Sequence, residues 1–550
     1  MAEKTKYFVL KQKAVPEVLL KVVEAKRLLD SGKAVSVQEA AENVGISRSS
    51  FYKYKDDIFP FHDNAKGKTI TMVIQLDDEP GLLSVVLRIV ADYHANILTI
   101  HQSIPVNGIA SLTLSVDVLN ETGDISQMVD TIEQQQGIHY LKILAREGQT
   151  MIQIAVLGYG TIGSGVAEVL KVNKESITKR VGDEISIKYI LDLREFPGDP
   201  MEDKIVHDYA VIKNDPEIAI VVEAMGGVEP AYTFAKQALE SGKHFATSNK
   251  ALIAEKGAEL IRIAKEKNVN CMFEASVGGG IPIIRPLNSC LTADVIEEVS
   301  GILNGTTNYM MTKMSSEGSE FEDVLKDAQQ KGYAEADPTA DIEGHDACRK
   351  IAILTSLVCG QQVDFQDIHT EGITKITATD IKYAKALGRS IKLLASSYKT
   401  GDSYCALVAP FMLAPEHPLY NVNDVFNAVF VHGNVLGDAM FYGSGAGKLP
   451  TASAVVGDIV EIARHLDENI PVEWREEKLE LADYKQLKNR YFVRTTAEKA
   501  AIEQAFGAVE YVQAEGVTGE CAFITAEMDG AAYDKAEGQI GAVLQSIRVK

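Results

Sequence analysis

Residues 151–171 read MIQIAVLGYGTIGSGVAEVLK, an apolar strand-like run followed at once by the glycine loop GYGTIG and a helical pattern. In this context Gly158 permits a tight turn, Gly160 lets the backbone approach a pyrophosphate, and Gly163 allows the helix to pack on the strand. The helix beginning near Thr161 would direct its free N–H groups and its dipole towards a diphosphate. The stretch predicts a doubly wound nucleotide-binding fold. The predicted cofactor-binding residues are Gly158, Gly160, Thr161, Ile162 and Gly163.

The next strand-like run, ISIKYILD, ends at Asp192, where a carboxylate can accept hydrogen bonds from the ribose 2′-hydroxyl of NAD. Arg194 follows two residues later, and its guanidinium could instead pair with the 2′-phosphate of NADP. The polar insertion at 171–184 also lengthens the usual spacing between glycine loop and acid. Asp192 and Arg194 are therefore both predicted to contact the cofactor, and the choice between NAD and NADP stays open.

Length and composition indicate a modular globular protein. A chain of 550 residues is long enough for roughly three or four domains. Hydrophobic residues make up 46% and charged residues 24%, which supplies apolar material for several cores. The fold class expected is α/β multidomain.

The charge and the apolar pattern exclude some partners. The formal net charge of -22 opposes attraction to nucleic acid or anionic lipid, because the summed field repels phosphate. No apolar run approaches the roughly 20 residues that span a bilayer, and no signal-peptide pattern opens the chain. The six cysteines are scattered and never form a CxxC pair. We expect a cytoplasmic protein with reduced thiols and neither membrane nor nucleic-acid partners.

The first domain expected is a helical segment at 1–66. Ala41, Gly45, Ile46 and Phe51 have the spacing of two short helices around a glycine turn, which resembles a helix-turn-helix. Residues 1–68 carry 13 Lys and Arg against nine Asp and Glu, so the segment is mildly basic. It could contact DNA, although such a fold is often only a packing module.

In residues 67–148, apolar and polar residues alternate with a period of two in strand-like runs, and helical runs lie between them. This pattern fits a βαββαβ order. The turn DDEPGLL places Pro80 and Gly81 where a strand ends and a helix opens. The segment resembles ACT domains, which bind amino acids near this turn, and residues 1–147 together resemble small ACT-domain regulatory proteins. A plain ferredoxin-like packing domain is the alternative.

The remaining chain divides into three further parts. A nucleotide-binding Rossmann domain is predicted at 150–285, and an α+β substrate domain at 286–465, with its last helix returning to the nucleotide domain. A charged linker precedes 485–550, which resembles a degenerate ACT-like domain without the DxPG turn.

Five long motifs carry a second, more specific resemblance. They are VVEAMGG (221–227), ATSNKALIA (246–254), EASVGGGIPI (274–283), GILNGTTNYM (301–310) and GYAEADPTADIEGHDACRK (332–350). Their order and spacing resemble the homoserine dehydrogenase family over residues 151 to about 465. The resemblance implies an NAD(P)-dependent oxidoreductase that interconverts L-homoserine and L-aspartate 4-semialdehyde.

The last motif gathers carboxylates around Lys350, and Asp346 lies four residues before it, on the same face of a helix. Clustered carboxylates need cations, and a substrate with an α-ammonium group supplies one. The reaction also needs a group that accepts a proton as hydride leaves and returns it in reverse. The resemblance implies that Lys350 is this group, with Lys250 as the second lysine reaching substrate and nicotinamide. It further implies substrate contacts from Glu335, Asp341 and Tyr333.

The stretch EASVGGGIPI offers oxygen ligands of the kind that hard cations prefer, so a Na⁺ site is possible. A glycine-rich hinge turn is the alternative. The resemblance implies that Glu274 would bind Na⁺ by its side chain, with carbonyls from Val277, Gly279 and Ile281. It also implies that Gly445, in a late glycine loop, lies near the cofactor.

Two functions from different classes follow. The favoured one is the dehydrogenase, acting as a homo-oligomer whose ACT domain binds an amino-acid effector. The alternative is a ligand-responsive DNA-binding regulator that retains a nucleotide-binding fold, because fold likeness alone does not establish activity.

Overall fold

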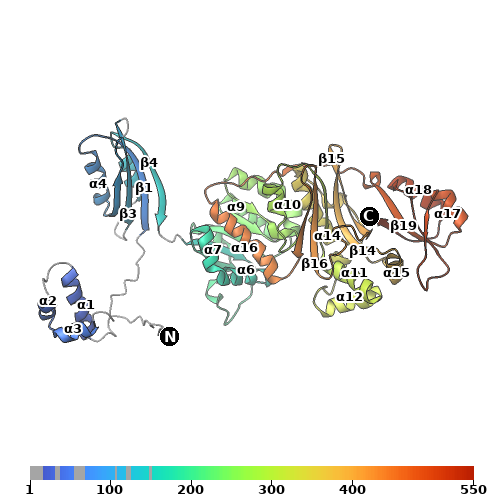
Figure 1. The fold of residues 1–550 in the computed structure, drawn as a ribbon, viewed down its shortest axis with the longest axis horizontal. Helices are drawn as coiled ribbons and strands as arrows, with labels where there is room; N and C mark the ends of the chain where they lie inside the picture. Colours follow the sequence, from blue (N-terminus) through green and yellow to red (C-terminus); the bar gives the residue numbers. More distant parts are fainter. Residues whose placement is uncertain (1–16, 31–36, 55–67, 106–107, 119–124, 148–150) are drawn as a thin grey trace. The chain divides into compact units, whose positions relative to one another are not determined.

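The computed structural model describes residues 17–30, 37–54, 68–105, 108–118, 125–147 and 151–550, and it divides into two compact units at 1–149 and 150–550 (Figure 1). Of the predicted helical segment, residues 1–16, 31–36 and 55–66 lie outside the described residues, as do the predicted domain limits at 148 and 150.

Three helices open the first unit: α1 (Glu17–Asp30), α2 (Val37–Asn43) and α3 (Arg48–Tyr54). Gly45 joins α2 to α3 with φ 71°, a left-handed conformation that glycine adopts without strain. The predicted pair of short helices around this glycine is therefore present. The small core that they share comprises Val22, Ala25, Ala40 and Phe51.

The second part of the first unit has the predicted βαββαβ order. Its elements are β1 (Lys68–Asp77), α4 (Leu82–Asp92), β2 (Asn96–Gln102), β3 (Ile109–Val118), α5 (Ile125–Glu133) and β4 (Ile138–Glu147). The sheet is antiparallel, with strand order β2-β3-β1-β4. Alternate residues of β1 are buried because successive side chains point to opposite faces of a strand. Gly81, with φ 97°, forms the N-cap of α4 in the predicted turn.

The second unit begins with a six-stranded parallel sheet of order β10-β9-β8-β5-β6-β7, as a doubly wound fold requires. Its strands are β5 (Ile152–Leu157), β6 (Ile185–Leu191), β7 (Ile205–Val206), β8 (Ile218–Glu223), β9 (His244–Thr247) and β10 (Cys271–Met272). Its helices are α6 (Thr161–Val172), α7 (Lys174–Val181), α8 (Tyr209–Asn214), α9 (Ala231–Glu240) and α10 (Lys250–Glu266). The polar insertion at 171–184 forms α7.

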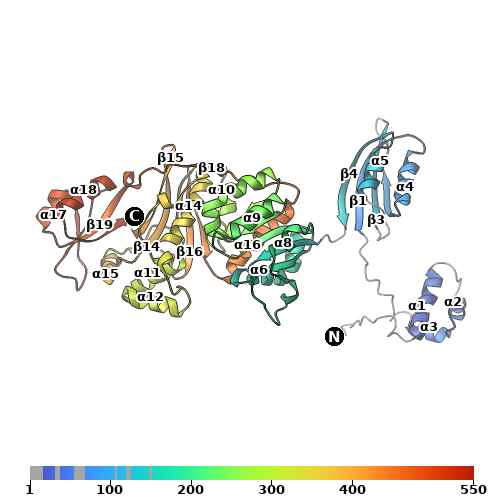
Figure 2. The same ribbon diagram turned by 180° about the vertical axis from the view of Figure 1, so that it is seen from behind.

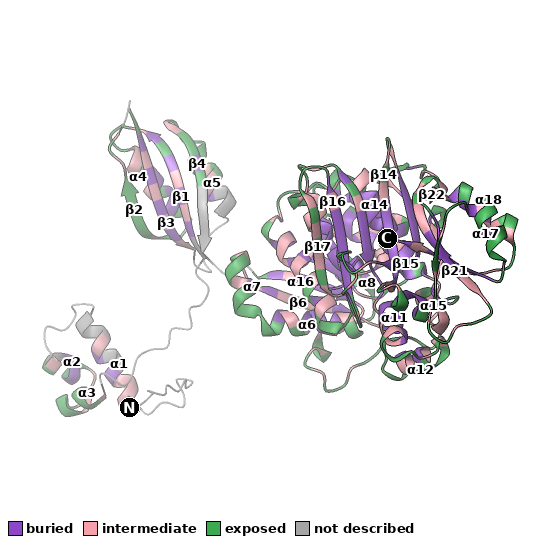
Figure 3. Ribbon diagram, turned by 45° about the vertical axis from the view of Figure 1, so that its right-hand side comes forward, coloured by how far each residue is buried: buried purple, intermediate pink, exposed green. Residues whose placement is uncertain are grey.

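The following part places helices against one face of an antiparallel sheet. The helices are α11 (Gly305–Glu317), α12 (Phe321–Gln330), α13 (Thr339–Ile342), α14 (His345–Cys359) and α15 (Ala378–Ala386). The strands of this sheet are β11 (Ile296–Ile302), β13 (His369–Thr370), β14 (Ser390–Thr400), β15 (Ser403–Leu413), β16 (Phe426–Gly433) and β17 (Gly437–Ser444). The short β12 (Gln361–Gln362) pairs instead with β18 (Arg475–Lys478) in a separate two-stranded sheet. Strands β14, β15 and β16 are mostly buried (Figure 3).

Helix α16 (Lys448–Arg464) returns to the nucleotide-binding part and lies beside α6 in both ribbon views (Figures 1 and 2). Ala452, Val455 and Ile459 of α16 share a core with β5 and α6. The substrate domain is thereby held to the dinucleotide fold at its end as well as at its beginning.

The C-terminal part joins the same sheet. It contains β18 (Arg475–Lys478), β19 (Lys488–Thr495), α17 (Lys499–Phe506), β20 (Glu510–Val512), β21 (Cys521–Ile524), β22 (Met528–Asp529), α18 (Gly530–Ile540) and β23 (Val543–Val549). Strand β23 pairs in parallel with β15, so eleven strands form one sheet. Arg494 reinforces the junction, because it pairs with the buried Asp380 of α15 at 2.6 Å. The linker pattern in the sequence did not indicate this continuity.

None of the described helices combines the length and the apolar character that crossing a lipid bilayer requires. All six cysteines are free.

Candidate functional site

A cavity of about 580 Å³ lies between the nucleotide-binding part and the helices of the substrate domain. Residues from both parts line it. They include Ile162, Ser248, Lys250, Ser276, Gly279, Asn304, Gly305, Thr306, Tyr333, Asp341, Asp346, Lys350, Val425, Ser444 and Gly445. The sequence motifs that are far apart along the chain therefore meet at one place.

The two predicted lysines share one carboxylate. Lys350 Nζ lies 2.7 Å from Asp346 Oδ2, and Lys250 Nζ forms an ion pair with Asp346 Oδ1. The pairing follows from the helices: Lys250 begins α10, whereas Asp346 and Lys350 lie one turn apart in α14. Lys350 Nζ also donates to the Leu303 carbonyl at 2.6 Å, which fixes the ammonium at the cavity wall.

Asp346 stays ionised in this setting. Burial alone would raise the pKa of its carboxyl, but the charges of Lys350 and Lys250 outweigh burial and hold that pKa well below its usual range. Two lysine side chains and one buried carboxylate therefore meet at the wall of the cavity.

Asn304, which the sequence analysis did not single out, joins this cluster to Asp341. Its side-chain amide donates to Asp341 Oδ1 at 2.7 Å and to Asp346 Oδ2 at 2.9 Å. Burial raises the pKa of the Asp341 carboxyl; the hydrogen bond from Asn304 opposes this rise, and the Asp346 charge adds to it. Asn304 also caps α11, since its Oδ1 accepts from Thr307 N at 2.8 Å. Its position in GILNGTTNYM, at a cap before a helix, was the available signal.

The other two predicted substrate residues lie differently. Tyr333 lines the cavity, and its carbonyl accepts a hydrogen bond from the Thr306 hydroxyl at 2.6 Å. Glu335 is exposed and is not part of the cavity wall. A substrate contact by Glu335 therefore stays a prediction.

The glycine loop has the geometry that a diphosphate needs. Gly158 has φ 91°, and a Cβ on Gly163 would lie 2.0 Å from the Gly158 carbonyl oxygen, so a larger residue cannot occupy position 163. Gly160 is the N-cap of α6, whose first residue is Thr161. A second cavity of about 470 Å³ is lined by Gly158, Gly160, Asp192 and Arg194, while Ile162 borders the cavity of the lysines. A dinucleotide would thus extend along the N-terminus of α6.

Asp192 and Arg194 are paired with each other. Asp192 accepts hydrogen bonds from Arg194 Nε and Nη2, each at 2.9 Å, and from Tyr159 N at 2.8 Å. The guanidinium holds the pKa of the Asp192 carboxyl well below its usual range, although burial opposes this. The 2′-hydroxyl of NAD would hydrogen-bond to Asp192, whereas the 2′-phosphate of NADP would pair with Arg194. Either contact would have to compete with the ion pair between these two residues.

The structure disagrees with Na⁺ binding by the Glu274 side chain. Glu274 Oε1 accepts from Ile283 N and Ile284 N, and Oε2 accepts from the backbone and the Nε of Arg285. These four donors fill a carboxylate, which accepts about four hydrogen bonds. The carboxylate therefore accepts hydrogen bonds from the backbone at the start of the next helical turn, and it has no lone pair left for a cation.

The predicted carbonyl ligands belong to the adjoining turn. Ile281 N donates to the Gly278 carbonyl at 2.9 Å, which closes the turn that contains Val277, Gly279 and Ile281. Gly445 lies against this turn, because a Cβ on Gly279 would meet the Gly445 carbonyl at 2.5 Å. The contact supports the alternative of a close-packed glycine hinge, and cation binding by these carbonyls stays a prediction.

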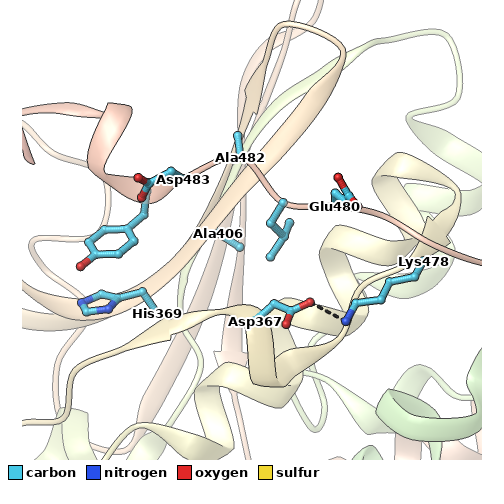
Figure 4. A pocket seen from close by; sticks show the side chains of 9 residues that line it. Asp367, His369, Ala406, Lys478, Glu480, Ala482 and Asp483 are labelled. Atoms are coloured by element: carbon cyan, nitrogen blue, oxygen red, sulfur yellow. Dashed lines mark ion pairs between the residues drawn. The ribbon is translucent and has the colours of Figure 1, made fainter. Parts of the chain in front are cut away.

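Another cavity of similar volume lies between β13 and residues 478–484 (Figure 4). Lys478 pairs with Asp367 at 2.7 Å, and both side chains are exposed. The His369 ring stacks on Tyr484, with centroids 3.9 Å apart. This cavity lacks the buried cluster of acids and lysines that distinguishes the first one.

Comparisons with known proteins agree with the site. A model of the homoserine dehydrogenase NAD-binding domain matches residues 158–274, and a homoserine dehydrogenase domain model matches 282–460. The homoserine dehydrogenase of Bacillus subtilis is 43% identical over 57% of this chain and 73% of its own length. That of Synechocystis is 47% identical over 56% of this chain and 73% of its own length.

The structural comparison gives the same family. A homoserine dehydrogenase structure from Thiobacillus denitrificans has a TM-score of 0.67 and 34% identity, and covers 73% of this chain and 98% of that one. These matches do not favour the alternative of a ligand-responsive DNA-binding regulator. The chain belongs to the homoserine dehydrogenase family and is an oxidoreductase.

Proposed function

We propose that this chain interconverts L-homoserine and L-aspartate 4-semialdehyde with NAD or NADP, and that Lys350 carries the proton. The observation that supports this most is the shared cavity, in which Asp341 and the Asp346 cluster face the first turn of α6. A polar substrate and a dinucleotide can both reach this place.

The substrate's charged groups have complementary partners. Asp341 provides a carboxylate for the α-ammonium group, and Tyr333 provides a wall beside it. The N-terminus of α11, with Gly305 and Thr306 at the cavity, offers N–H groups to the α-carboxylate. Glu335 is left out of this proposal because its side chain is exposed.

The proton step belongs to Lys350. In its neutral form Lys350 accepts the proton of the C4 hydroxyl, and as an ammonium it returns a proton to the aldehyde oxygen in the reverse direction. Asp346 and the Leu303 carbonyl fix its position, and Lys250 approaches the same carboxylate from the nucleotide side. A bound nicotinamide supplies the hydride acceptor. Gly158, Gly160, Thr161, Ile162 and Gly163 would hold the dinucleotide, with Gly445 close to it.

Regulation is proposed for the first unit. Residues 67–148 would act as an ACT domain that binds an amino acid at the turn of Asp78, Pro80 and Gly81, where no side chain caps the start of α4. Threonine is the natural candidate, as an end product of the biosynthetic pathway to which homoserine belongs. Because ACT domains bind at paired interfaces, we expect a homo-oligomer in which the effector shifts the enzyme between two states.

Replacing Lys350 tests the proton step. Lys350→Ala should lower kcat by about 10² to 10⁴ while the Kd of the cofactor, measured by calorimetry, changes little. Lys350→Arg should lower kcat to a similar extent, because arginine keeps the charge but does not release its proton. Lys326→Ala, at an exposed lysine, is the matched control and should keep full turnover. Wild-type turnover in Lys350→Ala would reject the assignment.

Asp192→Ala tests cofactor choice. Removing the carboxylate frees Arg194 for a 2′-phosphate and removes the acceptor for a 2′-hydroxyl, so kcat/KM should shift about 10- to 100-fold towards NADP. The measurement is the ratio of kcat/KM for the two cofactors, with the exposed Asp203→Ala as control. An unchanged ratio would show that Asp192 does not determine the cofactor preference, and that Arg194 or another residue does.

Deleting residues 1–148 tests regulation. The second unit is compact without them, so homoserine oxidation should persist while any response to amino acids disappears. A coupling of about 1 to 3 kcal/mol would make the lost response several-fold. Asp78→Ala in the full chain should weaken the same response without removing the domain. If the truncated enzyme responds to every amino acid as the full chain does, the first unit is not the sensor.

A further inference from the structure

Asn427 is a buried amide without a partner. It lies in β16, is fully buried, and neither its Nδ2 nor its Oδ1 has a hydrogen-bond partner among the described residues. Val429 and Val431, on the same face of the strand, are apolar core residues. Buried amides are almost always paired, so a leucine of similar size would suit this position better unless the amide has a use.

The amide lies directly beneath the wall of the catalytic cavity. A Cβ on Gly445 would be 2.1 Å from Asn427 Cγ, and a Cβ on Gly305 would be 3.5 Å from its Oδ1. Gly305 and Gly445 both line the cavity. The amide therefore contacts the backbone of two glycines that line the cavity.

The connection above the amide is exposed in part. Ala446 and Gly447, which follow Gly445, are exposed, and they connect the edge strand β17 to α16. Gly447 has φ 113°, a conformation that glycine alone adopts readily. Contact with a ligand would therefore require this connection to shift, because the Gly445 backbone packs between Gly279 and the amide.

The unpaired groups define the ligand chemistry. Because both a donor and an acceptor are free, the best partner is a group that accepts and donates side by side, namely another primary amide. The proposed substrate partners are already assigned: Asp341 to the ammonium and Lys350 to the hydroxyl. Among the groups of the substrate and the cofactor, the primary amide is the carboxamide of the nicotinamide ring.

We infer that Asn427 binds the cofactor's carboxamide and so orients the nicotinamide ring towards the substrate. The inference rests on the proposed function for the presence of a nicotinamide in this cavity. The inference also explains why position 445 is a glycine, since any side chain there would collide with the amide.

The test compares the preferred dinucleotide with its 3-acetylpyridine analogue, in which a methyl group replaces the carboxamide NH₂. Calorimetry on the full chain gives both Kd values. Wild type should bind the natural cofactor about tenfold tighter, which corresponds to about 1.4 kcal/mol. Asn427→Leu should bind both equally, at the weaker value, and its Tm should equal or exceed that of wild type. Asn427→Ala should also lose the discrimination.

Asn308→Leu is the matched control. Asn308 is an equally buried amide, but it is fully paired with the carbonyls of Val422 and Phe426 and with Lys392, so its loss should lower Tm. Wild type that does not discriminate, or Asn427→Leu that keeps the discrimination, would overturn the inference. Because binding is measured without turnover, a wild type that binds the dinucleotide but does not oxidise homoserine would refute the proposed function and not the role of Asn427.

Discussion

The buried carboxylate of Asp346 is the interaction on which the site depends. A charge removed from water is tolerated only with partners, and Asp346 has Lys350, Lys250 and the amide of Asn304. These partners come from three helices, α14, α10 and α11, of which α10 belongs to the nucleotide-binding part. The ion cluster thus fixes the relative position of the two parts at the place where hydride and proton must leave the same substrate.

Close approach of backbones is the second constraint. Gly163 touches the glycine loop, Gly279 touches Gly445, and Gly445 touches the amide of Asn427, each at a distance that no side chain permits. The cavity is therefore lined both by glycine backbone and by the lysine and aspartate side chains of the cluster. This division suits a dinucleotide, whose diphosphate requires N–H groups, and a substrate whose ends are charged.

Local patterns in the sequence predicted much of this. The spacing of Asp346 and Lys350 predicted their pairing, and the strand before Gly158 predicted the dinucleotide fold. Contacts between distant segments were not predictable: Asn304 meets Asp341 through the packing of α11 on α13, and β23 pairs with β15 only once the sheet has formed. Glu335 and the Glu274 side chain were assigned by resemblance. The Glu274 carboxylate is held by three backbone amides that no motif encodes.

The most direct test of the account is a double-mutant cycle on kcat/KM for homoserine, with Asp346→Asn, Lys350→Ala and the double variant. If Asp346 acts by holding Lys350, Asp346→Asn alone should lose most of the activity, and the double variant should be little worse than Lys350→Ala. Activity of Asp346→Asn within about twofold of wild type, or losses that multiply in the double variant, would contradict the claim that the two residues act as one unit.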